Sequence, residues 1–126
     1  MTALAMLFLI AHLSTGVLNI LIALPLIRRR IPPNGLYGFR TRKTRANEQV
    51  WYDANAYSGH CLKLAGIATI AAGFILYSFY FVVLRDPATQ PPRIQMIYLG
   101  VGLCILTLPV LASVVASYRH LHRIAP

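Results

Sequence analysis

The sequence predicts an all-α fold: a three-transmembrane-helix membrane bundle with a short interfacial helix in its first cytoplasmic loop. The first observation is that 57% of the 126 residues are hydrophobic and that they gather in runs with almost no charge, at residues 3–27, 62–84 and 96–118. Each run reaches the roughly 20 residues that an α-helix needs to cross about 30 Å of hydrocarbon. The second is that all the charged residues except Lys63 stand between and after these runs, whereas amphipathic helices of soluble proteins carry charge along one face. We therefore expect residues 1–126 to form a single membrane domain.

The first span is predicted over about residues 3–27. We expect it to be retained rather than cleaved as a signal peptide, because no basic side chain precedes it and its apolar run exceeds about 15 residues. His12 and Asn19 share one helix face with Thr15 or Gly16 between them. Polar side chains in hydrocarbon are costly unless they are paired, so this face should point toward the other spans. Pro25 should bend or end the helix.

The cytoplasmic loop and interfacial helix are predicted over residues 28–58. This segment carries seven of the twelve Lys and Arg residues: Arg28, Arg29, Arg30, Arg40, Arg42, Lys43 and Arg45. Asn34-Gly35 is a turn dipeptide, and Gly38 marks a second place where the backbone turns. The planar fork of Arg40 suits a carboxylate, a phosphate headgroup or an acidic partner. It suits equally well the backbone carbonyls at the ends of the spans, so docking and bracing both remain open.

A helix is predicted near residues 45–58, lying along the membrane surface or leading into the second span. Thr44 is expected to cap it, and Glu48 suits its first turn. Trp51 suits the headgroup level, where an aromatic ring has one wet edge. The second span itself is expected over about residues 60–84.

Gly59, Gly66 and Gly73 are spaced seven apart along the second span and fall on one face, as in closely packed membrane helices. Lys63 either snorkels to the interface or pairs with Asp53 or with the polar face of the first span. An outer loop of residues 85–95 leads to a third span over about residues 96–118, which Pro109 should kink.

The distribution of charge predicts the orientation. Loops rich in Lys and Arg stay in the cytoplasm, which places the N-terminus outside and the loop of residues 28–58 and the tail of residues 119–126 inside. The net charge of +9 then lies mostly against the cytoplasmic leaflet. It favours a bilayer with anionic lipids as partner. No recognition helix or aromatic–basic surface indicates nucleic acid.

The loop contains a motif that resembles a known family. Its residues are Asn34-Gly-Leu-Tyr-Gly38-Phe-Arg40-Thr41, followed by Thr44, Trp51, Asn55 and Gly59. They resemble the signature of the SdpI family of small bacterial integral membrane proteins, although Arg42 stands where that family usually has Pro. The resemblance implies a multi-pass protein of the bacterial inner membrane. It also implies an immunity or signalling role, with a peptide toxin or a regulatory protein as partner and the motif residues as docking or structural positions.

No enzymatic activity is expected, because no Ser–His–Asp set, carboxylate pair or phosphate-binding loop is visible. No cofactor is expected, and the pairs His120-x-His122 and His60-Cys61 do not supply the four ligands of a zinc site. The alternative function is a small oligomeric transport or permeation component. His12, Asn19, Lys63 and Thr107 would then line a polar path, and oligomerisation would be needed because three helices do not easily enclose a pore.

Overall fold

The computed structural model describes residues 2–83 and 91–126, and these form four helices and no strand. They are α1 (Thr2–Ile27), α2 (Arg42–Ala46), α3 (Glu48–Val83) and α4 (Pro92–Ile124). Three of them, α1, α3 and α4, are long and apolar enough to cross a membrane. The predicted all-α fold with three spans is therefore confirmed. Residues 84–90 of the predicted outer loop lie outside the described residues.

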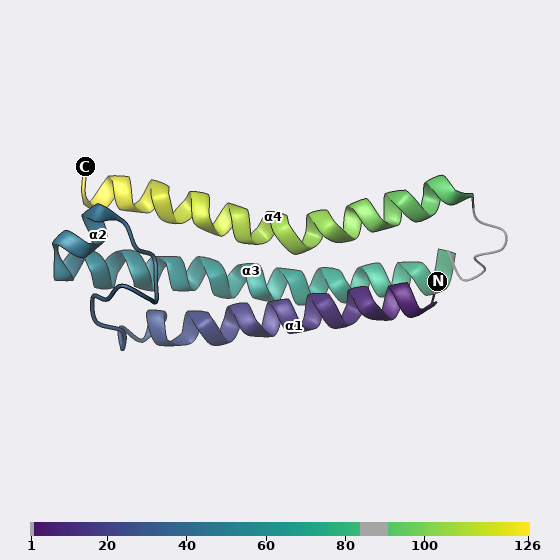
Figure 1. Ribbon diagram of the computed structural model, residues 1–126, viewed down its shortest axis with the longest axis horizontal. Coiled ribbons are helices and arrows are strands. Elements are labelled where there is room, and N and C mark those ends of the chain that lie inside the picture. Colours follow the sequence, from purple (N-terminus) through teal and green to yellow (C-terminus); the bar gives the residue numbers. More distant parts are fainter. Residues whose placement is uncertain (1, 84–90) are drawn as a thin grey trace.

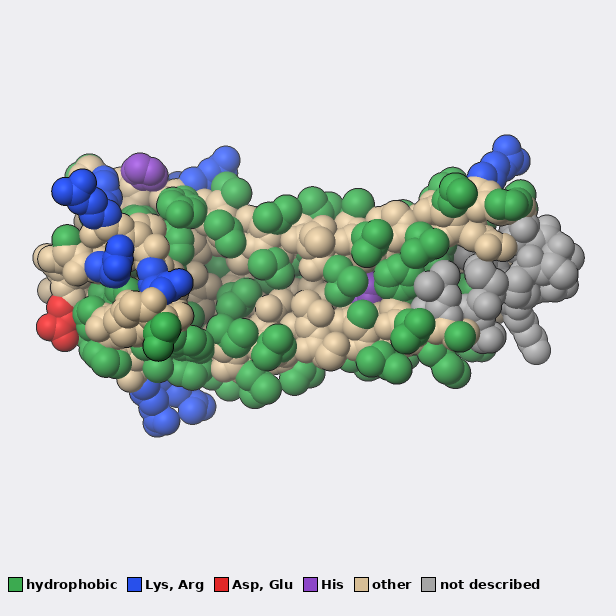
Figure 2. All heavy atoms as spheres, viewed as in Figure 1, with side chains coloured by type: hydrophobic (Ala, Val, Ile, Leu, Met, Phe, Trp, Pro, Cys, Tyr) green, Lys and Arg blue, Asp and Glu red, His purple; other side chains and the backbone are tan. Residues whose placement is uncertain are grey.

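The three long helices run side by side as a bundle (Figure 1). The N-terminus lies at one end, and α2 and the C-terminus lie at the other, which we call the loop end. On the face drawn in Figure 2, hydrophobic side chains cover the middle of the bundle, and blue Lys and Arg side chains stand near its two ends. Large apolar side chains such as Leu18, Ile75 and Leu103 are more than half exposed. Lipid is the solvent in which such a surface is stable.

Glycines form the seam between α1 and α3. A Cβ atom built on Gly66 would lie 2.6 Å from the carbonyl oxygen of Gly16 on α1, and one on Gly73 would lie 2.6 Å from the Cβ of His12. On Gly59 it would lie 3.0 Å from the carbonyl oxygen of Ala23. The contacts at Gly66 and Gly73 are too short for a real side chain, and the contact at Gly59 is tighter than most Cβ atoms make. The seven-residue glycine spacing on α3 therefore marks the face on which the backbones of α1 and α3 approach closely.

The core that joins α4 to the other two helices is aromatic. Phe8 of α1 packs its ring edge-to-face against Tyr98 of α4, with 5.9 Å between the ring centroids. Tyr98 also contacts Tyr80 of α3 at 5.6 Å. A Cβ on Gly102 would lie 3.0 Å from the Phe8 ring, so this glycine makes room for it. Helix α4 is bowed about its middle in Figure 1, and Pro109 stands at the middle of its residue range.

The helix boundaries at the loop end differ from those expected. Helix α3 begins at Glu48 and runs without a break to Val83, so of the two placements considered for residues 45–58 the structure shows the one that leads into the span. Thr44 does not cap this helix. Asn47 does so, because its Oδ1 accepts hydrogen bonds from the backbone N–H groups of Gln49 at 2.9 Å and Val50 at 3.2 Å. Thr44 instead completes a capping box with Thr41 at the start of α2.

Helix α1 runs through Pro25 and ends at Ile27. Arg29, with φ 53°, adopts the left-handed conformation that usually falls to glycine at this position. The N–H groups of Arg29 and Arg30 donate to the carbonyls of Leu26 and Pro25, each at 3.1 Å. These two bonds form a Schellman motif, which satisfies the last carbonyls of α1 and turns the chain away from the bundle axis.

Candidate functional site

The candidate site is the motif loop, which we define as residues 30–47, together with the first turns of α3. Asn34 organises its first turn. Its Oδ1 accepts from the N–H groups of Leu36 at 2.8 Å and Tyr37 at 2.7 Å, and its Nδ2 donates to the carbonyl of Pro32 at 2.8 Å. This Asx-type turn satisfies backbone groups that have no helix or sheet partner. The guanidinium of Arg40 then donates to the carbonyl of Gly35, which ties the end of the turn to its beginning.

The backbone of Phe39 is the point at which the loop is fixed to α3. Asn55, which is 2% exposed, accepts from the Phe39 N–H through Oδ1 at 2.6 Å and donates from Nδ2 to the carbonyls of Phe39 and Trp51. The buried hydroxyl of Thr44 lies 3.1 Å from the Phe39 carbonyl and donates to it. The side-chain amide of Asn55 thus binds both the N–H and the C=O of Phe39, a residue sixteen positions away, so the backbone donor and acceptor of Phe39 are both satisfied.

Trp51 and Gly38 pack beneath this contact. Trp51 is completely buried, and its Nε1–H donates to the carbonyl of Ile31 at 2.8 Å. Gly38 has a φ of 110°, and a Cβ on it would collide with the Oδ1 of Asn55 and lie 3.4 Å from the Trp51 ring. Both the backbone conformation and the available space therefore require glycine at position 38.

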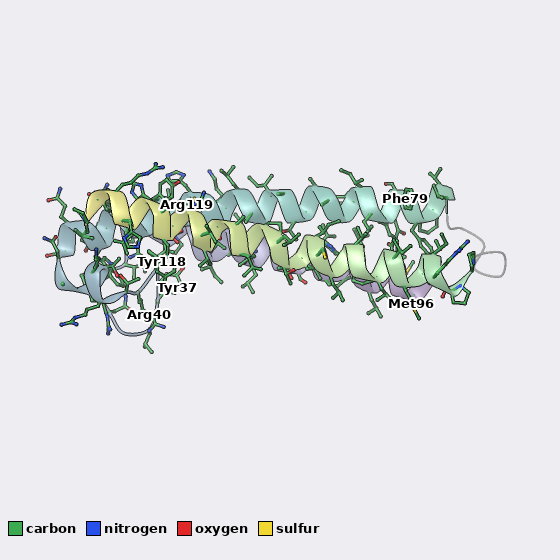
Figure 3. All side chains as sticks on the ribbon, turned by 90° about the horizontal axis from the view of Figure 1, so that it is seen from above. Tyr37, Arg40, Phe79, Met96, Tyr118 and Arg119 are labelled. Atoms are coloured by element: carbon green, nitrogen blue, oxygen red, sulfur yellow. The ribbon has the colours of Figure 1, made fainter. Side chains whose placement is uncertain are left out.

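The motif loop bridges α1 and α4. The Tyr37 hydroxyl donates to the carbonyl of Ile22 on α1, and burial raises the pKa of that hydroxyl above its ordinary value. The Phe39 ring packs edge-to-face on Tyr118 of α4, with 4.9 Å between the centroids. Figure 3 shows Tyr37, Arg40 and Tyr118 gathered at the loop end. The Lys43 Nζ adds a hydrogen bond of 2.7 Å to the carbonyl of Ala125.

The remaining basic side chains of this end point outward. Arg29 pairs with Asp53 at 2.6 Å, with both side chains partly exposed. The side chains of four exposed arginines have no hydrogen bond or ion pair within residues 2–83 and 91–126; they are Arg28, Arg30, Arg42 and Arg45. Beside them in the loop, Leu36 is 92% exposed. These five side chains, of which Arg28 lies just before the motif loop and the others lie within it, are what we call the outer surface of the motif loop.

The structure places the polar residues of the spans in different surroundings. His12 and Asn19 lie on the buried face of α1, against the glycines of α3. His12 Nδ1 lies 2.6 Å from the Phe8 carbonyl, whereas His12 Nε2 and Asn19 Nδ2 find no partner in the described part of the chain. Thr107 is exposed on α4 and donates to the carbonyl of Leu103 of its own helix. It does not share a face of the bundle interior with His12 and Asn19.

Lys63 is half-buried on α3, and no ion pair of its side chain occurs among the described residues. Asp53, one of the partners considered for it, is engaged by Arg29. Sequence reasoning had not singled out Tyr37, Tyr118 or Asn47 as anchors of the loop. Only Asn47 carried a usable signal, since Asn directly before a Glu-led helix is a common N-cap.

The part of the chain that resembles known proteins includes the motif loop. The model of the SdpI/YfhL protein family matches residues 30–117, which is more than half of the chain and includes the motif loop, α3 and most of α4. "Uncharacterized protein YfhL" of Bacillus subtilis (strain 168) is 29% identical over 68 residues, which cover 52% of this chain and 62% of that protein. The matched stretch thus spans less than two thirds of that relative's length. No solved structure matches. The extent of the family match establishes that this chain belongs to the SdpI/YfhL protein family.

Proposed function

We propose that this chain is a non-enzymatic immunity or signalling protein of the bacterial inner membrane. In this proposal, the outer surface of the motif loop is the place where a regulatory protein docks. Membership of the SdpI/YfhL family and the three membrane-spanning helices support the general assignment. The observation that carries the docking assignment is a division of labour among the loop residues. The hydrogen bonds of four polar residues go to the backbone of the loop itself; these residues are Asn34, Thr44, Trp51 and Asn55. The four arginines of the outer surface and Leu36 instead face outward.

The chemistry of the outer surface defines the partner. Four guanidinium groups that have no acid partner in the described part of the chain favour an acidic protein surface, and each makes paired hydrogen bonds to a carboxylate readily. Leu36, exposed at the tip of a turn, supplies an apolar side chain that a docked partner would cover. A rigid support beneath these groups lowers the entropy lost on docking. The motif residues would provide that support.

The role is tested by deleting the gene in its bacterial host and exposing the cells to the peptides that the host secretes. We expect the deletion strain to be killed and the intact chain, supplied from a plasmid, to restore survival. The variant Arg42→Gln/Arg45→Gln should reach the membrane in normal amount but should protect poorly. The matched control is Arg93→Gln, which removes a cation from the opposite end of the bundle and should protect like the wild type.

Two results would contradict the proposal in different ways. Full survival of the deletion strain would remove the immunity role. Full protection by Arg42→Gln/Arg45→Gln, at unchanged abundance, would remove the docking surface while leaving the family assignment intact.

A further inference from the structure

A second polar feature lies at the loop end, between α3 and α4 and apart from the motif loop. It is a hollow of about 420 Å³ lined by Tyr57 of α3 and by Arg119, His120 and Arg123 of α4. Tyr118, the neighbour of Arg119, faces the motif loop through Phe39. In Figure 3, Arg119 lies on the α3 side of α4, and Tyr37 and Arg40 lie on the other side. The hollow is therefore a separate site, which we call the α3–α4 hollow.

The α3–α4 hollow carries two positive charges, and no acidic side chain is among its described lining residues. Arg119 and Arg123 are one helical turn apart and share a face of α4. Neither side chain makes a hydrogen bond or ion pair within the described ranges 2–83 and 91–126. Of the two described acids, Asp53 is paired with Arg29, and Glu48 lines a different hollow beside Arg29. The guanidinium groups of Arg119 and Arg123 are therefore available to bind an anion.

The rest of the lining indicates what kind of anion fits. The rings of Tyr57 and His120 are stacked, with centroids 3.9 Å apart and planes 9° apart, and they form a flat wall beside the arginines. Ala112 and Val115, one to three turns before the arginines on α4, give the hollow an apolar floor that extends toward the middle of the helix. The site is therefore amphipathic, with two cations at the loop end of the bundle and small apolar side chains nearer the middle of α4.

We propose that the α3–α4 hollow binds the phosphodiester headgroup of an anionic phospholipid. The phosphate would accept hydrogen bonds from Arg119 and Arg123, and an acyl chain would lie along Ala112 and Val115. Basic pockets between membrane helices on the cytoplasmic side recognise lipid headgroups in this way. A bilayer supplies such lipids at high local concentration, whereas a soluble phosphate compound would leave the apolar floor unused. This inference does not depend on the immunity or signalling role.

The test uses the full chain in mild detergent, with an equimolar mixture of phosphatidylglycerol and phosphatidylcholine, and counts bound lipids by native mass spectrometry. Each cation near an anionic headgroup is worth about fivefold in affinity, so the two arginines together should give the wild type a preference for phosphatidylglycerol of roughly 25-fold. Arg119→Gln/Arg123→Gln should reduce this preference to about twofold or less, on the same estimate. Arg42→Gln/Arg45→Gln, which removes two exposed charges from α2, is the matched control and should keep the preference.

Further variants keep the test decisive. Arg119→Lys/Arg123→Lys retains both charges and should retain most of the preference. If the double Gln variant fails to fold by circular dichroism, Arg123→Gln alone should lower the preference about fivefold. An equal loss in the α2 control would overturn the proposal, because it would show a response to net charge alone. Displacement of phosphatidylglycerol by millimolar inorganic phosphate would overturn the lipid assignment in favour of a soluble phosphate compound.

Discussion

The close approach of α1 and α3 makes a sharp prediction for Gly66→Ala. The new Cβ would lie 2.6 Å from the carbonyl oxygen of Gly16, and 3.0 Å and 3.2 Å from side-chain carbons of Ile20 and Asn19. An ordinary contact begins near 3.4 Å, so the helices must separate by about 3.4 − 2.6 = 0.8 Å at this point. The first of these atoms belongs to the backbone, which cannot rotate away as a side chain does. The whole seam has to open.

Overpacking of this kind costs about 1–3 kcal/mol, and each opened contact also loses dispersion energy. Gly100 provides the matched control, because nothing lies within 4 Å of a Cβ built on it. Gly100→Ala removes only backbone freedom from the unfolded chain and should stabilise α4 by about 0.5–1 kcal/mol. The two substitutions make the same chemical change in the same kind of helix, and the structure predicts effects of opposite sign.

The free energy of unfolding can be measured by titrating the detergent-solubilised chain with sodium dodecyl sulfate. Trp51, the single tryptophan, is fully buried and reports unfolding by its fluorescence. We expect the transition of Gly66→Ala to move to lower denaturant and that of Gly100→Ala to move slightly higher. If the two variants shift equally, or if Gly66→Ala leaves the transition in place, the glycine seam is not what holds α1 against α3.

Four further predictions concern the motif loop and the second span. Trp51→Phe leaves the Ile31 carbonyl without its donor and should cost about 1–3 kcal/mol in the same titration, followed by circular dichroism. Gly38→Ala meets both a positive φ and a blocked space, so it should lower the free energy of unfolding by about 1–3 kcal/mol. Burial raises the pKa of the Tyr37 hydroxyl above 10.0, so the folded state holds that proton more tightly; stability should fall as the pH rises past about 10, and less so in Tyr37→Phe. Lys63→Met should change the free energy of unfolding by less than about 0.5 kcal/mol if the ammonium group only reaches back to the interface.

The spans and the helix seam could be predicted because their causes are local in sequence. An apolar run of sufficient length has no stable place other than a bilayer, and the spacing of Gly59, Gly66 and Gly73 selects one face of a helix. The helix ends at the loop end were harder to place. Thr41, Thr44 and Asn47 are all competent N-caps within seven residues, and the modest preference for Asn over Thr does not say which of them begins which helix. The sequence does not indicate that Arg29 ends α1 in a left-handed conformation, because this position is usually Gly and sometimes Asn.

The partners within the motif loop could not be predicted for a different reason. The motif named Asn55 and Gly38, but the spacing of sixteen residues between Asn55 and Phe39 says nothing about which backbone group the amide will clamp. Which backbone group Asn55 binds depends on where the Asx turn of Asn34 and the hydrogen bond from the Trp51 indole place the loop backbone. Each of these contacts presupposes the others, so the loop conformation is a property of the whole set.

This interdependence gives the motif loop a mechanical consequence. Tyr37 holds the loop to α1 and the Phe39 ring holds it to α4, whereas the Phe39 backbone is held by Asn55 of α3. A change at Asn55 should therefore loosen all three helices at the loop end, even though this buried residue is out of reach of a docking protein. A change at Arg42 or Arg45, whose side chains make no contact of this kind in the described structure, should leave the bundle intact. Loss of protection at unchanged stability is thus the signature of a docking residue, and loss of both together is the signature of the support beneath it.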